Sequence, residues 1–107
     1  MSKISFEYEG TEYTLEYTKR TIKAMEAEGF VPGDIDNKPM TMLPLLFAGA
    51  FKAHHRFVRQ EVIDDIYDSL PDKEGLVGAL AEMYNEQLTY LMKEPEPGKN
   101  VSWTVIK

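Results

Sequence analysis

The chain has 107 residues, which is enough for one domain but not for two independent hydrophobic cores. Its hydrophobic fraction (43%) and charged fraction (28%) are those of ordinary globular proteins, and its lack of cysteine excludes disulfides, thiolate metal sites and cysteine nucleophiles. The net charge of -6 disfavours nucleic acid as a partner, because an acidic surface repels a phosphate backbone.

The first predicted element is a β-hairpin. Residues 3–17 alternate apolar and polar side chains around Glu9-Gly10, a pair suited to the centre of a tight turn. This pattern places Tyr8 opposite Thr11 and gives the hairpin one apolar face. A lone hairpin is marginally stable in water, so we expect that face to lie on helices or to gain a third strand.

Four helices are predicted to follow the hairpin. Thr18 should cap a short helix that ends at Gly29, and residues 31–41 are expected to form a loop. Thr41 should cap a helix running to about residue 57, which is apolar nearly all round and is therefore predicted to be the central helix. A helix over roughly residues 60–69 and a longer one, capped by Asp72 and running to residue 92, complete the set.

The C-terminal residues follow a different pattern. Residues 94–98 form a stiff, charged linker, and the alternation of Val101, Trp103 and Val105 predicts a strand that joins the hairpin. A disordered tail, or a strand lent to another subunit of a homo-oligomer, are the alternatives left open. We therefore predict an α+β fold, with one domain over residues 1–93, in which the hairpin packs on about four helices, and a linker and tail over residues 94–107.

The sequence offers little for catalysis. His54 and His55 are adjacent, so on a helix they point about 100° apart and cannot readily hold one metal ion. We expect His54 to be partly buried and His55 to lie on the polar face. The chain also has no Gly-rich phosphate loop and no Gly-x-Ser-x-Gly motif, so we expect neither an enzyme nor a bound cofactor or metal.

Candidate residues for binding a partner protein come from three places. Asp64, Asp65 and Asp68 gather on the third predicted helix, where they could pair internally with Lys52, Arg56 and Arg59 or bind an external basic ligand. Met40 and Met42 are predicted to be an exposed, adaptable pair at the start of the central helix. The candidates are Met40, Met42, Arg56, Arg59, Asp64, Asp65, Asp68 and the only tryptophan, Trp103.

We expect the protein to act in the cytoplasm. The longest apolar stretch, residues 42–51, is far shorter than the ~20 residues that span a bilayer. The N-terminus also lacks the apolar core of a secretory signal. No membrane association is therefore predicted.

Three stretches resemble a known family: ISFEYEGTEYTLEYT at residues 4–18, DNKPMTMLPLLFAGAFKAHHR at residues 36–56 and LPDKEGLVGALAEMYNEQLTYLM at residues 70–92. They resemble small proteins from phages and prophages of Gram-positive bacteria, a family similar to the tail assembly chaperones of long-tailed phages. The resemblance implies a protein that keeps the tape-measure protein soluble and recruits the major tail protein around it. A structural head or tail joining subunit that stays in the virion is the alternative.

Overall fold

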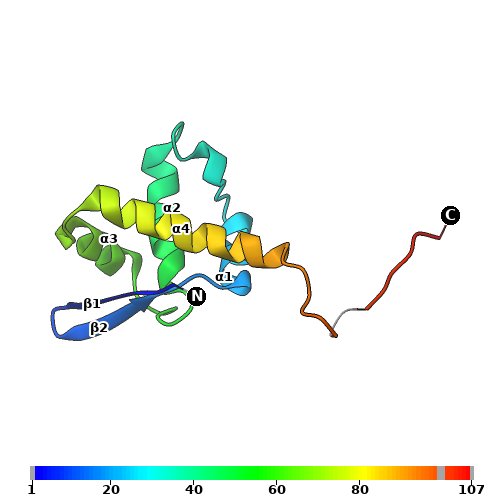
Figure 1. The fold of residues 1–107 in the computed structure, drawn as a ribbon. Coiled ribbons are helices and arrows are strands. Elements are labelled where there is room, and N and C mark those ends of the chain that lie inside the picture. Colours follow the sequence, from blue (N-terminus) through cyan, green and yellow to red (C-terminus); the bar gives the residue numbers. More distant parts are fainter. Residues whose placement is uncertain (1, 99–100, 107) are drawn as a thin grey trace.

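The computed structural model describes residues 2–98 and 101–106 and shows an α+β fold, as predicted (Figure 1). A two-stranded antiparallel hairpin comes first and four α-helices follow. The elements are β1 (Ile4–Tyr8), β2 (Thr11–Leu15), α1 (Lys19–Ala27), the short 3-10 helix η1 (Pro32–Asp34), α2 (Pro39–Phe51), α3 (Gln60–Ser69) and α4 (Lys73–Leu91).

The hairpin has the predicted register, with Tyr8 opposite Thr11 and Phe6 opposite Tyr13. Glu9 and Gly10 both have positive φ, 49° and 81°, which is the conformation that a two-residue hairpin turn requires. Tyr13 and Leu15 are buried on the apolar face, and the backbone N–H of Glu16 donates to the carbonyl of Ala50 on α2. The hairpin is thus attached to the helices through β2.

Helix α1 begins and ends as predicted. The side chain of Thr18 accepts from the N–H of Thr21, and the backbone N–H of Thr18 in turn donates to the side-chain oxygen of Thr21. Gly29 has a φ of 98°, and the N–H of Phe30 donates to the carbonyl of Met25 at 3.0 Å. These bonds satisfy backbone groups that the helix ends would otherwise leave unpaired.

Helix α2 is the centre of the fold, as its all-round apolar sequence predicted: it contacts α1, α3, α4, β2 and η1. Its predicted limits were wrong at both ends. It begins at Pro39, whose fixed φ suits a first turn and whose missing N–H costs little there, so Thr41 is not its cap. It ends at Phe51 instead of about residue 57, because the chain then turns back onto the hairpin, where the ring nitrogen Nε2 of His55 accepts from the N–H of Thr14 at 3.0 Å.

The α3 and α4 helices have close to the predicted bounds. Asp72 caps α4 by accepting from the N–H of Gly75 at 3.1 Å. The last turns of α4 are less well covered than its middle: Leu88 and Leu91 are 39% and 62% exposed. Both residues line a shallow recess together with Ile22 and Lys23 of α1, which covers them only in part. Figure 1 shows the end of α4 reaching past α1.

The tail does not extend the sheet. Over the described residues 2–98 and 101–106, the sheet consists of β1 and β2 alone, and Trp103 is 80% exposed. The prediction of a third strand is therefore wrong for this part of the chain. Figure 1 shows the tail running away from the helices, which gives the molecule a longest dimension of 56 Å against 31 and 25 Å for the others. Within the described residues, no helix has the length and apolar character needed to cross a membrane.

Tyr17 joins the hairpin to the core through a polar contact. Its side chain is 1% exposed, its hydroxyl donates to the carbonyl of Leu46, and its ring lies edge-on to that of Tyr84. Burial raises the pKa of the Tyr17 hydroxyl far above its ordinary value, and the neighbouring Tyr84 raises it further. The folded protein therefore strongly favours the neutral phenol at this position.

This burial predicts a loss of stability in alkali. The pKa of Tyr17 is higher in the folded than in the unfolded state, so its contribution is fully present below about pH 10 and is lost as the pH rises above that value. Tyr17→Phe should cost about 1 kcal/mol near neutral pH, through the lost hydrogen bond. Above about pH 10, the free energy of unfolding of the Tyr17→Phe variant should fall less steeply with pH than that of the wild type. Urea titrations monitored by circular dichroism across this pH range would measure both effects, and parallel pH profiles would contradict this account.

Candidate functional site

An apolar groove lies between the first half of α2 and the middle of α3. It has a volume of about 360 Å³. The rings of Phe47 and Tyr67, one from each helix, meet edge-on with their centres 5.1 Å apart. The groove is lined by Pro39, Met40, Leu43, Pro44, Phe47, Ile63, Asp64, Tyr67 and Asp68.

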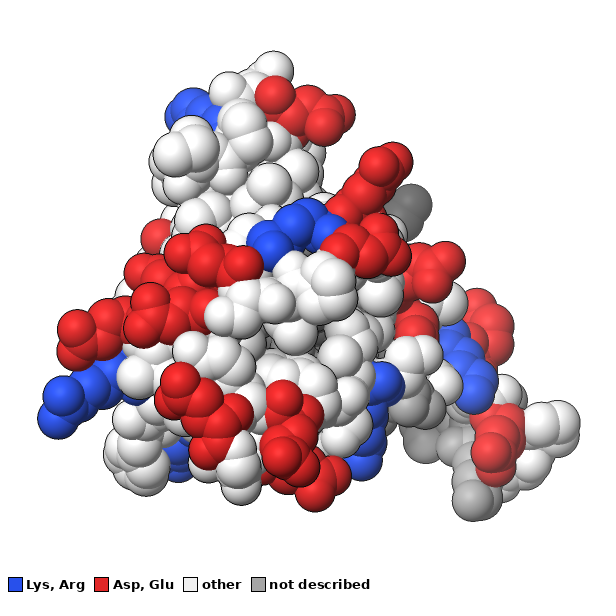
Figure 2. Space-filling view, turned by 90° about the vertical axis from the view of Figure 1, so that its left-hand side faces the viewer, with Lys and Arg blue, Asp and Glu red and all other residues white. Residues whose placement is uncertain are grey.

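Two carboxylates line this groove from α3. Asp64 and Asp68 are four residues apart on the helix, so they lie on one face, and both are exposed. Figure 2 views the side of the molecule where α3 lies in Figure 1, and acidic groups there outnumber basic ones around uncharged surface. The groove therefore combines an apolar floor with a negative edge.

The structure brings three of the predicted residues together in this groove: Met40, Asp64 and Asp68. Met40 is 90% exposed, as predicted, but Met42 is only 5% exposed and its sulfur accepts from the N–H of Val31. The prediction that Met42 is exposed was therefore wrong. Because α2 begins three residues earlier than expected, position 42 already lies within the helix, on the face that points into the core.

The remaining candidates lie elsewhere. Asp65 is exposed on α3 but does not line the groove, and Trp103 is in the projecting tail. Arg59 precedes α3 and lies 3.9 Å from Glu61, while Arg56 lines a different cleft, between α1 and the end of α2.

The aspartates of α3 are not paired with the basic residues that the sequence offered as internal partners. Over residues 2–98 and 101–106, no ion pair joins Asp64, Asp65 or Asp68 to Lys52, Arg56 or Arg59. Asp64 instead accepts a hydrogen bond from the side-chain amide of Gln60 at 2.9 Å. The predicted internal pairs are therefore wrong for these residues, and the exposed carboxylates of Asp64 and Asp68 are open to an external ligand.

The two histidines have the opposite roles to those expected. His54 points outward with its side chain 39% exposed, and its Nε2 lies 2.6 Å from a carboxylate oxygen of Glu16. His55 is half-buried against the rings of Tyr13 and Phe51. Both stand in the turn after α2 and not on the helix, so helical geometry did not apply to them. Within the described part of the chain, no three His, Cys, Asp or Glu side chains are grouped closely enough to hold a metal ion.

The apolar half of the groove was not predicted from the sequence. Leu43, Phe47 and Tyr67 lie in the core or pack against it, and each of them also lines the groove. The run Pro39-Met40-x-x-Leu43-Pro44 was the available signal, since it places apolar side chains on the outer side of a helix whose other faces are also apolar.

The fold and the groove together define a small α+β protein with one apolar, acid-edged surface recess formed by two helices. A protein-family model described as "Domain of unknown function (DUF5055)" matches residues 1–106, so the chain belongs to that family. Searches of curated proteins and of solved structures gave no match to this chain.

Proposed function

We propose that this protein is a tail assembly chaperone of a long-tailed phage or prophage, and that the groove between α2 and α3 binds helices of the tape-measure protein. It acts in the host cytoplasm as a binding protein and not as an enzyme, and it recruits the major tail protein around its client. The resemblance of residues 4–18, 36–56 and 70–92 to phage proteins supports this role. The apolar groove with its two carboxylates would provide the surface that binds the client.

The groove suits an amphipathic helix. Phe47 and Tyr67 offer apolar contacts at its floor, and Met40 offers a flexible side chain at its mouth. Helix α3 has ten residues, about 15 Å, which corresponds to roughly three turns of a bound helix lying alongside it. An amphipathic helix is aggregation-prone until its apolar stripe is covered, so binding in this groove would keep it soluble.

The carboxylates select among such helices. Asp64 and Asp68 would attract lysine or arginine side chains that flank the apolar stripe of the client. Their mutual repulsion, a few tenths of a kcal/mol in the free protein, would be relieved when a basic residue lies between them. The preferred client is therefore an apolar-striped helix with basic flanks.

Co-expression tests this proposal. The tape-measure protein encoded with this chain should move from the insoluble to the soluble fraction when the two are produced together, and the complex should purify as a unit. A bystander protein of similar size and charge serves as the control. Mass spectrometry of purified virions should not find this protein at the stoichiometry of a structural subunit; finding it there would favour a head or tail joining subunit instead.

A further inference from the structure

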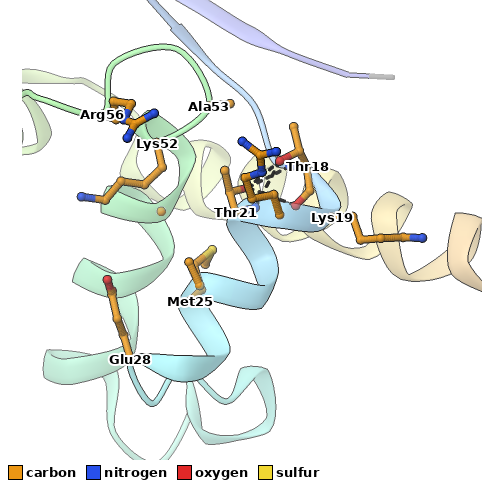
Figure 3. A pocket seen from close by; sticks show the side chains of 11 residues that line it. Thr18, Lys19, Thr21, Met25, Glu28, Lys52, Ala53 and Arg56 are labelled. Carbon is orange, nitrogen blue, oxygen red and sulfur yellow. Dashed lines mark hydrogen bonds between the residues drawn. The ribbon is translucent and has the colours of Figure 1, made fainter.

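A second recess, of opposite charge, lies between α1 and the end of α2 (Figure 3). It has a volume of about 780 Å³, and its lining includes Lys19 and Arg20 from α1 and Lys52 and Arg56 from the end of α2 and the turn after it. These four are a third of the 12 basic residues of the chain, gathered in one place on a protein of net charge -6. We call this recess the basic cleft.

The cations of the basic cleft are not neutralised by the protein itself. Over the described residues, none of the four forms an ion pair, and the single carboxylate in the lining is that of Glu28. The lining therefore carries four positive charges and one negative, a net charge of +3. In Figure 3 Lys52 and Arg56 lie on one side of the cleft and Thr18 and Thr21, at the start of α1, lie on the other, while the side chain of Lys19 extends outward from α1.

The floor between these charges is apolar. It is formed by Ala24, Met25, Gly49 and Ala53. Glycine at position 49 lets α1 approach α2 closely, since a Cβ there would lie 2.4 Å from the sulfur of Met25. The hydroxyls of Thr18 and Thr21 are already used in the cap of α1. Recognition in the cleft must therefore come from the cations and the apolar floor.

We propose that the basic cleft binds a short acidic segment of a partner protein that also carries an apolar side chain. Carboxylates of the segment would pair with Lys19, Arg20, Lys52 and Arg56, while the apolar side chain would contact Ala24 and Ala53, the accessible part of the floor. A nucleic acid fits less well, because the net charge of -6 on the whole protein repels an extended phosphate backbone.

This site goes beyond the proposed function, because it shares no lining residue with the groove. The groove is lined by the first half of α2 and by α3, whereas the cleft is lined by α1, the end of α2 and the turn after it. Figure 1 shows α1 and α3 on different sides of α2. One copy could hold a basic-flanked helix and an acidic segment at the same time. The protein would then act as an adaptor between two partners of opposite charge.

A fluorescein-labelled peptide rich in glutamate, with a central leucine pair, tests the proposal by fluorescence anisotropy. The wild type should bind it at low salt and lose affinity as ionic strength rises. Lys52→Glu/Arg56→Glu should weaken binding at least about ten-fold. Lys3→Glu/Lys93→Glu makes the same change in net charge outside the cleft and should have little effect. If the charge reversal perturbs folding by circular dichroism, Lys52→Gln/Arg56→Gln replaces it.

Four results would overturn the proposal: no binding by the wild type at low salt, equal losses in the cleft and control variants, tighter binding of a single-stranded oligonucleotide, or competition by inorganic phosphate at comparable concentration. Binding of a lysine-flanked helix to the groove is measured separately with the same variants. If Lys52→Glu/Arg56→Glu still binds this helix, then its loss of acidic-peptide binding is a property of the cleft and not of the groove.

Discussion

Phe51→Ala should destabilise the protein by about 3–5 kcal/mol, the usual cost of removing a buried aromatic side chain. Phe51 is 0% exposed at the end of α2, and its ring lies edge-on to those of Phe47 at 5.1 Å and Tyr13 at 5.9 Å. It therefore connects the central helix with the hairpin. Since a domain of this size has a total stability of about 5–15 kcal/mol, the variant should be close to unfolding. Urea denaturation followed by circular dichroism would measure the loss.

Phe57→Ala is the matched control. Phe57 lies six positions after Phe51, and its side chain is 89% exposed. Among the described residues, its ring makes one aromatic or cation–π contact, with the guanidinium of Arg56. Its free energy of unfolding should change by no more than about 0.5–1 kcal/mol. Similar losses in the two variants would contradict the placement of Phe51 at the centre of the core.

Asp64→Lys/Asp68→Lys should weaken binding of a lysine-flanked amphipathic helix by at least about ten-fold. Each exposed pair contributes up to about 1 kcal/mol, and reversal replaces that attraction by a comparable repulsion, so the two together exceed the 1.4 kcal/mol of a ten-fold change. The fold should persist, because both side chains are exposed and two lysines repel each other about as much as two aspartates do. Titration calorimetry would measure the affinity.

Glu61→Lys/Asp65→Lys provides the control on the same helix. These residues have the same four-residue spacing and both are exposed, but neither lines the groove. The net charge changes by the same amount, so a general electrostatic effect would appear in both variants. Only the variant with the two substitutions in the groove should lose affinity for the helix. An equal loss of affinity in both variants would show that the groove is not the binding site.

The order and type of β1, β2 and the four α-helices followed from the sequence, because local signals determined them. Alternation around Glu9-Gly10 defined the hairpin register, and Thr18, Gly29 and Asp72 marked helix ends through their own side chains or backbone conformation. The limits of α2 did not follow. Its apolar pattern continues past Phe51, and only the contacts of His55 with Thr14 and Tyr13, which are distant in sequence, show why the helix stops there.

The candidate site was predictable only in part. Asp64 and Asp68 were found from their spacing on one helix, and Met40 from its position beside two prolines. That these three meet across two helices is a consequence of tertiary packing, which no local pattern contains. The same holds for the basic cleft: Lys19 and Arg56 are 37 positions apart in the chain, and nothing in the sequence indicated that they line one recess.

The most direct test of the central claim is a calorimetric comparison of two synthetic helices that share the apolar stripe of a tape-measure segment. One carries lysine on both flanks of the stripe and the other carries glutamine. If the groove between α2 and α3 is the client site, the wild type binds the lysine-flanked helix at least about ten-fold more tightly, and this preference disappears in Asp64→Lys/Asp68→Lys. Equal affinities for the two helices, or no binding of either, would contradict it.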